Sequence, residues 1–499
     1  MTLATVRRKT ERIRRFSALP FLLIASISLL GALFKPAPQL ATGGPLNAGD
    51  VAWMLTATGL VLLMTPGLSF FYGGMVRSKN VLSLLMQVMI IFCLGILMFA
   101  VYGYSVSFTE GSNPFFGGFS KLFLKGMTGD SLTGTFSKAT NIPELGFFVF
   151  QATFAAITPG LIIGALAERV KFSALLVFII LWLTFSYYPI AHMVWFWSGP
   201  DAYTTAEAGA AANINAGFLF NKGALDFAGG TVVHMSSGWS ALILCLILGK
   251  REGFGRRPFV PHSLVLTMVG TGMLWVGWYG FNAGSAVAAD GIAAGAFVAT
   301  TLATAVATCV WPALEWVTRG KPTVLGFCSG AVAGLVVVTP GAGFVTPTGA
   351  ILIGLLAGAV PFYACTKLKN ALKYDDALDT FGVHGVGGTL GALLTGFFAN
   401  PEANPNLNNN LSGIVGKTLW IEQLKAIGFT MVMAIGGTVV LAYTIKAVIG
   451  LRPDKEGEEA GLDAIDHGES GYHHEEEYGG LLEGASHAAV PAKASAQSA

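Results

Sequence analysis

The sequence predicts an all-α polytopic membrane protein with eleven transmembrane helices, on three observations. Of its 499 residues, 53% are hydrophobic and only 12% are charged, whereas a soluble domain carries about 25% charged residues. The 64 glycines suit closely packed membrane helices, because small residues let helix backbones approach each other. After residue 50, about eleven apolar stretches reach the roughly 17–25 residues that a helix needs to cross a bilayer. The net charge of +2, without a basic patch, gives no indication of nucleic-acid binding.

Residues 1–50 have the pattern of a signal peptide followed by the start of a mature chain. A basic segment between Arg7 and Arg15 precedes an apolar run from Phe16 to Phe34, and Pro- and Ala-rich sequence follows as far as Ala41. This order is typical of a cleaved secretory signal peptide. The alternative is an uncleaved twelfth helix, because the apolar run nearly reaches spanning length.

Residues 51–450 form the predicted membrane domain, with boundaries good to a few residues. It divides into a first half at 51–249, a second half at 261–399 and a long eleventh helix at 425–450. The predicted spans are 51–75, 81–106, 145–167, 173–198, 226–249, 261–283, 290–315, 324–340, 347–366, 380–399 and 425–450.

The loop charges predict the orientation in the membrane. The loops after the odd-numbered spans carry 13 Lys and Arg residues, and the intervening loops carry six. The richer set is expected to be cytoplasmic. This places residue 51 outside and the C-terminus inside a plasma (inner) membrane. Because a first span that starts outside needs a signal peptide or a further helix, we favour the signal peptide.

The remaining segments lack the patterning of a core. The long loops 107–144 and 199–225 are rich in small and polar residues and are expected to be solvated connections. The acidic tail, 451–499, shows no apolar periodicity, and disorder is expected over 480–499. The five cysteines fall in apolar runs without metal-ligand spacing, so buried free thiols are expected. They are Cys93, Cys245, Cys309, Cys328 and Cys365.

Two histidines in apolar surroundings are the most unusual feature. Asp226 precedes His234 by eight residues, and Asp376 precedes His384 by eight. An ionisable residue inside a membrane span is costly and indicates a functional site by default. Because each half has an odd number of spans, the second half enters the membrane upside down, an arrangement typical of transporters. Eight helical residues carry each histidine about 12 Å inward, so the two approach the midplane of a ~30 Å layer from opposite faces.

The same residues also have structural explanations. An Asp at a helix start is a common N-cap, and a membrane histidine often only hydrogen-bonds a neighbouring helix. We favour a polar site on a conduction path for the histidines, because two units at matched spacing are harder to explain by helix packing than one.

Six motifs occur in order between about residues 50 and 472. They are Phe-Gln-Ala-Thr-Phe (150–154), Gly-Ala-Leu-Ala-Glu-Arg (164–169), Ala-His-Met-Val-Trp (191–195), Asp-Phe-Ala-Gly-Gly-Thr-Val-Val-His (226–234), Gly-Trp-Tyr-Gly-Phe-Asn-Ala-Gly-Ser (277–285) and Phe-Gly-Val-His-Gly-Val-Gly-Gly (381–388). Together they closely resemble the ammonium transporters of the Amt/MEP/Rh family, in particular the bacterial Amt type. The resemblance implies the ammonium-transporter fold and a homotrimer with one pore in each protomer, with neither enzymatic activity nor a cofactor or metal.

The resemblance also implies an outer recruitment site formed by Phe154, Trp195 and Ser285, with Trp278 near it. Ammonium is a small cation with four N–H donors, so aromatic faces and a hydroxyl oxygen suit it, and each cation–π contact is worth ~0.5–2 kcal/mol. Phe154 and Phe281 match a stacked gate, which makes the passage of a bare ion costly. Without the resemblance, Trp195 would be interpreted as an interfacial residue and Phe154 as core.

For the remaining site residues the resemblance implies three further roles. His234 and His384 match twin histidines that line the pore, titrate as a pair and pass a proton along while ammonia moves. Asp226 matches a buried acid that supports the recruitment site without being a direct ligand. Asp376 and Asp379 match structural acids at the inner end of the tenth span.

The segments 450–454 and 461–472 resemble the cytosolic C-terminal region of Amt proteins, which couples neighbouring protomers. Gly461, Asp463 and Glu469 are therefore expected to be structural or regulatory. In bacterial relatives a PII-type signalling protein can block the pore from this side. Beyond Tyr472, including His473 and His474, we expect a solvated acidic tail and not a metal site.

Three other functions fit parts of the sequence less well. An ammonium sensor (transceptor) of the same fold would need either an output domain, for which about fifty polar tail residues leave no room, or a partner through which it signals. A Rh-type ammonia gas channel is disfavoured by Trp195 and Ser285, which build the cation site. A membrane metalloenzyme using His234 and His384 would lack a third convergent ligand.

Overall fold

The structure is a computed structural model that describes residues 45–203 and 205–472, with a few helical positions between residues 22 and 33. The predicted signal peptide and the predicted disorder over 480–499 fall almost entirely outside the described residues.

Within the described ranges, eleven helical spans are long and apolar enough to cross a membrane, which confirms the predicted all-α class and number. They are Ala48–Met75 (α3), Ser78–Phe108 (α4 and α5), Glu144–Leu166 (α6), Phe172–Trp195 (α7 and α8), Gly230–Leu248 (α10 and the turn before it), Leu264–Gly284 (α11), Gly291–Arg319 (α12), Val324–Gly341 (α13), Pro347–Leu372 (α14 and α15), Phe381–Phe398 (α16 and the turn before it) and Leu419–Val448 (α18). The ninth span continues to Leu372 where the sequence predicted 366, and the eleventh begins at Leu419 where it predicted 425.

Several spans are composite, because a wide, π-helical turn interrupts or begins them. The individual bounds are Val81–Met98 (α4), Phe99–Gly103 (η2), Tyr104–Phe108 (α5), Phe172–Trp182 (α7), Leu183–Tyr187 (η4), Tyr188–Trp195 (α8), Gly230–Met235 (η7), Ser236–Leu248 (α10), Val324–Val338 (α13), Pro347–Tyr363 (α14), Ala364–Leu368 (η9), Lys369–Leu372 (α15), Phe381–Val386 (η10) and Gly387–Phe398 (α16). Both histidines of interest lie in such turns, His234 in η7 and His384 in η10.

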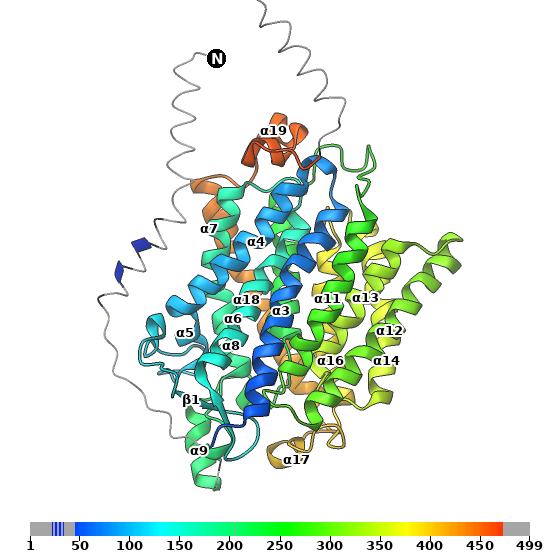
Figure 1. Ribbon diagram of the computed structural model, residues 1–499. Coiled ribbons are helices and arrows are strands. Elements are labelled where there is room, and N and C mark those ends of the chain that lie inside the picture. Colours follow the sequence, from blue (N-terminus) through cyan, green and yellow to red (C-terminus); the bar gives the residue numbers. More distant parts are fainter. Residues whose placement is uncertain are drawn as a thin grey trace, which may run out of the picture.

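Short elements mark the two ends of the bundle (Figure 1). One end carries α9 (Ala206–Asn215), α17 (Leu407–Asn410) and a hairpin of β1 (Leu132–Gly134) and β2 (Asn141–Pro143), and we call it the α9 end. The strands are antiparallel, with Thr133 opposite Ile142. The opposite, α19 end carries α19 (Lys455–Ala460).

Equivalent spans of the two predicted halves pack against each other in opposite directions. The first span, α3, lies along α11, the first span of the second half. Gly74 at the end of α3 touches Thr267 near the start of α11, and Gly284 at the end of α11 touches Ala57 near the start of α3. This antiparallel contact is the one that an inverted repeat requires.

The fifth and tenth spans cross in the same antiparallel sense, and glycines form the contact. Gly238 of α10 lies on the backbone of Gly385, and Gly388 of α16 lies on Gly230 and His234. A Cβ atom at Gly238 would overlap the facing backbone. The glycines therefore let the two turns that carry the histidines approach each other.

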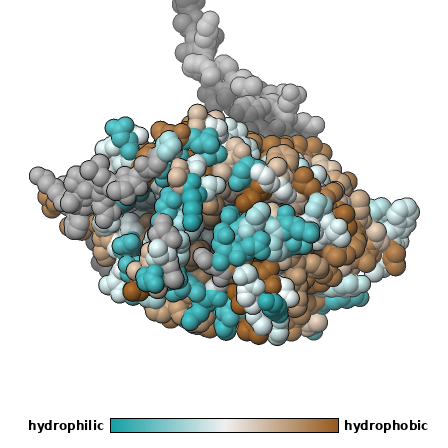
Figure 2. All heavy atoms as spheres, turned by 90° about the horizontal axis from the view of Figure 1, so that it is seen from below, coloured by the Kyte–Doolittle hydropathy of each residue, from teal (hydrophilic) through white to brown (hydrophobic). Residues whose placement is uncertain are grey.

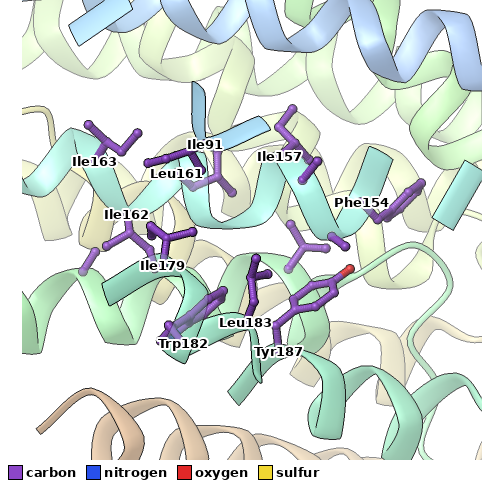
Figure 3. Packing of buried hydrophobic residues seen from close by; sticks show 14 of the residues in the cluster. Ile91, Phe154, Ile157, Leu161, Ile162, Ile163, Ile179, Trp182, Leu183 and Tyr187 are labelled. Carbon is purple, nitrogen blue, oxygen red and sulfur yellow. The ribbon is translucent and has the colours of Figure 1, made fainter. Parts of the chain in front are cut away.

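Apolar side chains fill the space between the spans and also cover much of the outside. Figure 3 shows Ile162 of α6 beside Ile179 of α7, with Phe154 further along the same α6 helix. Figure 2, which looks onto the α9 end, shows hydrophilic side chains gathered across this end and hydrophobic ones around its margin. Large apolar side chains such as Val265 and Val432 are exposed on the spans, as expected of a surface in contact with lipid.

The five cysteines are all free, as predicted, but they are not all buried. Cys245 and Cys328 are buried, Cys365 is half-buried, and Cys93 and Cys309 are exposed. The prediction of burial was wrong for Cys93 and Cys309, because an apolar run does not distinguish a helix face that contacts protein from one that faces outward.

The first part of the tail folds back onto the α19 end through polar contacts. The Asp463 carboxylate accepts hydrogen bonds from the backbone N–H groups of Leu82 (3.1 Å) and Ser83 (2.8 Å) at the start of α4. The Leu462 N–H donates to Asn80 Oδ1 at 2.9 Å. Residues 451–472 therefore need no apolar core of their own to be ordered.

Candidate functional site

Two cavities lie on either side of the stacked Phe154 and Phe281 rings. The larger has a volume of about 930 Å³, and Phe154, Trp195, Asp226 and Ser285 are among its lining residues. The smaller has a volume of about 10 Å³, which is about one water position. Its apolar wall includes both His234 and His384.

A stacked pair of phenyl rings separates the cavities. The centroids of Phe154 and Phe281 are 4.1 Å apart with an interplanar angle of 18°. Phe154 lines the large cavity and Phe281 lines the small one. Both side chains are 1% exposed, so the pair closes the direct route between the two spaces.

Three residues predicted for the recruitment site meet at the inner end of the large cavity. The Trp195 ring meets Phe154 edge to face, with centroids 5.9 Å apart, and its indole N–H donates to the Asp226 carbonyl oxygen at 2.8 Å. The Ser285 hydroxyl donates to the Phe281 carbonyl oxygen at 2.8 Å. Trp195 therefore offers only its π face to the cavity, and Ser285 only the lone pairs of its oxygen.

Trp278 lies elsewhere than the sequence predicted. It lines the small cavity, on the far side of the phenyl pair from Trp195 and Ser285. Its ring stacks on His234 with a centroid distance of 5.4 Å, and its N–H donates to Thr339 Oγ1 at 2.9 Å. The resemblance implied a place near the recruitment site, but seven residues along α11 separate Trp278 from Ser285.

The Asp226 carboxylate caps the helical turn η7. Its two oxygens accept hydrogen bonds from the N–H groups of Gly229, Gly230, Thr231 and Val232 and from the Thr231 hydroxyl, at 2.5–3.1 Å. A carboxylate has about four lone-pair sites, so these five donors leave none for a ligand. Asp226 thus positions Trp195 through its carbonyl and the His234 turn through its carboxylate.

The two histidines are in direct contact. Their Nδ1 atoms lie 3.3 Å apart, and the side chains of His234 and His384 are 1% and 2% exposed. A hydrogen bond between two imidazoles needs one donor and one acceptor nitrogen. Within the described residues, Nε2 of His234 has no hydrogen-bond partner. The pair can therefore hold a proton between its rings and still present a free nitrogen.

Asp376 and Asp379 lie toward the α19 end. The Asp376 carboxylate accepts from the N–H groups of Thr380 (3.0 Å) and Phe381 (2.7 Å), and so caps η10 as Asp226 caps η7. Burial raises the pKa of Asp376 to about 6. The half-exposed Asp379 forms an ion pair with Lys369 at 2.6 Å.

A buried ionic cluster holds the loops of the α19 end together. Arg251 pairs with Asp375 at 2.8 Å and with Glu168 at 3.5 Å, and Glu168 also pairs with Arg77 at 2.7 Å. Burial alone would raise the pKa of Glu168, but the hydrogen bond from Arg77 and the charge of Arg251 outweigh it and lower that pKa. The pKa of Asp375 is lowered against the same effect of burial by its hydrogen bond from Arg251.

The three tail residues predicted as structural or regulatory have different surroundings. Gly461 has a φ of +109°, and its Cα lies against the Lys79 backbone, so a side chain would not fit. Asp463 caps the start of α4. Glu469 is exposed and contributes its backbone N–H to the Asp463 carbonyl oxygen at 3.2 Å.

Two contributions to the large cavity were missed from the sequence. The loops 107–144 and 199–225, predicted as solvated connections, supply much of its wall, including Glu110 and Phe220. Gln151 also lines it. Its position three residues before Phe154, on the same face of a helix, was the available signal.

Among the described residues, no group of three or more His, Cys, Asp or Glu side chains is placed to hold a metal ion.

Comparisons with known proteins agree with one another. The sequence profile of the Ammonium Transporter Family matches residues 52–472. The ammonium transporter of Mycobacterium tuberculosis (strain ATCC 25618 / H37Rv) is 45% identical over 456 residues, covering 87% of this chain and 92% of the relative. The ammonium transporter of Bacillus subtilis (strain 168) is 42% identical, covering 86% and 99%.

Solved structures show the same similarity. The crystal structure of Saccharomyces cerevisiae Mep2 superposes with a TM-score of 0.72 at 33% identity, covering 85% of this chain and 96% of that one. A structure titled "Sensor Amt Protein" superposes with a TM-score of 0.74 at 25% identity, covering 84% and 98%.

Proposed function

The chain belongs to the Ammonium Transporter Family and transports ammonium across a membrane, and we propose that Phe154, Trp195 and Ser285 receive the cation in the large cavity. Each of the three contributes what a small cation needs. The two aromatic rings offer their π electrons, a contact worth ~0.5–2 kcal/mol each, and the hydroxyl oxygen accepts an N–H.

The observation that carries this proposal is the order of features along one line. The large cavity holds the recruitment residues, the stacked Phe154–Phe281 pair follows, and the small apolar cavity with the histidine pair lies behind it. Removing the water shell of an ion without replacing its hydrogen bonds is costly. Ammonia, being neutral, crosses such a partition far more easily than ammonium.

In this mechanism the cation gives up a proton to solvent water in the large cavity beside the phenyl pair, and neutral ammonia passes into the small cavity. His234 and His384 share one proton through their Nδ1 contact. They accept or release it as ammonia moves past, and ammonia is protonated again beyond them.

A direct test is the Trp195→Leu variant, assayed for ammonium transport in proteoliposomes. Loss of the π face raises the ammonium KM about fivefold to tenfold, as the loss of one cation–π contact predicts. Trp420→Leu is the control, because Trp420 lines neither cavity. An unchanged KM in Trp195→Leu would show that the cation is not recruited there.

The orientation follows from the charge distribution. We propose that the α19 end, where the Lys- and Arg-rich loops such as 250–257 lie, faces the cytoplasm. Labelling of single cysteines introduced at exposed positions of either end, in intact cells, tests this. If cysteines at the α19 end react with an impermeant reagent in intact cells, that end faces outward and the proposed orientation is wrong.

We also propose a homotrimer and a regulatory PII-type partner on the cytoplasmic side. Native mass spectrometry of the detergent-solubilised protein tests the trimer. Copurification with a PII-type protein, with and without residues 451–499, tests the partner.

A sensory role is the second candidate, and the structural likeness to a protein titled as a sensor favours it. Deleting the gene and restoring it with a transport-dead His234 and His384 variant separates the two roles. A sensor would restore the response to ammonium without restoring uptake.

A further inference from the structure

The recruitment site holds fewer acceptor atoms than its cation has donors. Ammonium carries four N–H groups. Phe154 has no acceptor atom, and the indole N–H of Trp195 is a donor bound to Asp226. The carboxylate of Asp226 is saturated by five donors of its own turn. Of these groups, only the Ser285 oxygen is free to accept.

Gln151 supplies a further acceptor at the same place. It lines the large cavity from helix α6. It precedes Phe154 by three residues, which puts its side chain about one turn away on the same helix face. Its amide oxygen is buried and, within the described part of the chain, has no hydrogen-bond partner. A buried polar atom without a partner costs stability. A hydrogen bond from a bound cation to the Gln151 amide oxygen would offset this cost.

The acidic side chain on this face of α6, Glu144, is already engaged. Glu144 begins α6, about 10 Å from Gln151 along the helix axis. Its carboxylate forms an ion pair with Lys121 and accepts the Tyr104 hydroxyl at 2.8 Å. It therefore does not compete with Gln151 for a cation at the level of Phe154.

We propose that the Gln151 amide oxygen is a second hydrogen-bond acceptor for ammonium and sets the preference for ammonium over methylated ammonium ions. The inference deepens the proposed function and rests on the recruitment site assigned there. Methylammonium has three N–H donors, and its methyl group can lie against the Phe154 and Trp195 rings. It therefore loses less than ammonium when one acceptor is removed.

The experiment measures uptake of labelled methylammonium and its inhibition by ammonium in cells that lack other ammonium transporters. One assay then gives the methylammonium KM and the ammonium inhibition constant for each variant. Gln151→Leu raises the ammonium inhibition constant about tenfold, as the loss of one hydrogen bond to a charged group predicts. It raises the methylammonium KM about threefold or less, so the preference for ammonium falls.

The chain provides a matched control in Gln87. Its amide oxygen is also buried without a partner among the described residues, its nitrogen donates to Ser83 Oγ at 3.0 Å, and it lines neither cavity. Gln87→Leu therefore carries the same change in volume and polarity and leaves the preference unchanged. Gln151→Glu, which keeps the acceptor, retains the preference for ammonium.

The outcomes separate this inference from the proposed function. If Gln151→Leu changes both constants by the same factor, or neither, Gln151 is not the selective ligand. If Trp195→Leu also leaves both constants unchanged, the recruitment site itself is misassigned. A response to Trp195→Leu together with none to Gln151→Leu overturns only the role of Gln151.

Discussion

His234 and His384 face each other through their Nδ1 atoms at 3.3 Å, although 150 residues separate them in the chain. The contact depends on glycines, since Gly238 and Gly388 bring the two helical turns together. Each turn is capped by an aspartate eight residues before its histidine. The same construction is thus used twice, from opposite ends of the bundle, to place two rings in one apolar cavity.

Removing either ring should impair transport strongly. His234→Ala is expected to lower ammonium transport about 100-fold, the lower range for loss of a positioned proton-transfer group. The double variant His234→Ala/His384→Ala should cost no more than the single one, because the two rings act as a unit. Proteoliposome currents and internal pH, recorded together after an ammonium pulse, measure both.

The control for the histidine pair is His192→Ala. His192 is also fully buried, with one nitrogen bound to the Ser107 carbonyl oxygen and the other unpartnered within the described residues. It lines neither cavity. Equal losses in the His192 and His234 variants would attribute the effect to a damaged fold. Additive losses in the double variant would contradict a shared proton.

Removing a ring of the stacked Phe154–Phe281 pair should let other cations pass while ammonium transport is retained. Phe281→Ala removes one of the two stacked rings and joins the large and small cavities, so potassium or sodium ions can leak through proteoliposomes that were tight before. Phe178→Ala is the matched control, since Phe178 is equally buried at 1% exposure and lines neither cavity. The unfolding free energy falls by roughly 3–5 kcal/mol in both variants, but only Phe281→Ala should leak. If Phe281→Ala proteoliposomes do not leak potassium or sodium ions, the stacked phenyl rings are not the barrier to these ions.

The spans were predictable because their signal is local. Eleven apolar stretches and the charges between them suffice to count and order the helices, and the parity of five spans per half predicted that α3 and α11 run in opposite directions. The depths of the two histidines were predictable because two matched aspartate–histidine spacings fix them, whereas the spacings permitted the contact between the rings without requiring it. Resemblance to a known family then assigned Phe154, Trp195 and Ser285, which no spacing rule connects.

The features that the sequence did not predict depend on contacts between segments that are distant in the chain. The loops 107–144 and 199–225 look like solvated connections, because the residues that wall a polar cavity have the same composition as residues in water. Exposed Cys93 and Cys309 have the same apolar neighbours in sequence as buried Cys245. Trp278 sits with the histidines, not with Ser285, because one helix passes both levels.

The ionic cluster at the α19 end should be a main source of stability for its loops. Arg251→Met leaves Asp375, which is 2% exposed, as a buried carboxylate without its main partner, whereas the similarly buried Glu168 keeps its ion pair with Arg77 at 2.7 Å. The expected loss of unfolding free energy is about 3–5 kcal/mol. Arg319→Met, which removes an exposed partner of Glu315, should cost ~0–1 kcal/mol. Thermal unfolding in detergent measures both, and equal effects would contradict the assigned burial.

The same cluster predicts loss of stability in acid. The pKa values of Glu168 and Asp375 are lowered from their ordinary 4.5 and 3.8. Their contribution is therefore fully present above about pH 4.5 and is lost as the pH falls through the lowered values. Arg251→Met should weaken this loss below pH 4, because the native state then no longer favours the ionised form of Asp375. An unchanged pH profile in that variant would assign the acid sensitivity to other groups.

Docking of the tail should respond to pH in the opposite sense through Asp466. This residue lies in the turn η11 (Asp463–His467), and its Oδ2 is buried without a hydrogen-bond partner within the described residues. Burial raises the pKa of Asp466 to about 6 against the opposing charge of Lys171. The docked tail therefore favours the protonated form, and docking weakens as the pH rises from about 4 to about 6.

Asp466→Asn removes this dependence, because the amide keeps an acceptor for the Phe172 N–H without acquiring a charge. Hydrogen–deuterium exchange over residues 451–472, corrected for intrinsic rates, should be slower in Asp466→Asn than in the wild type at pH 7.5. The difference should shrink at pH 5. Glu469→Gln, which neutralises an exposed acid of the same segment, is the control and should match the wild type at both values. If Asp466→Asn exchanges like the wild type at pH 7.5, the buried carboxylate is not what opposes docking of the tail.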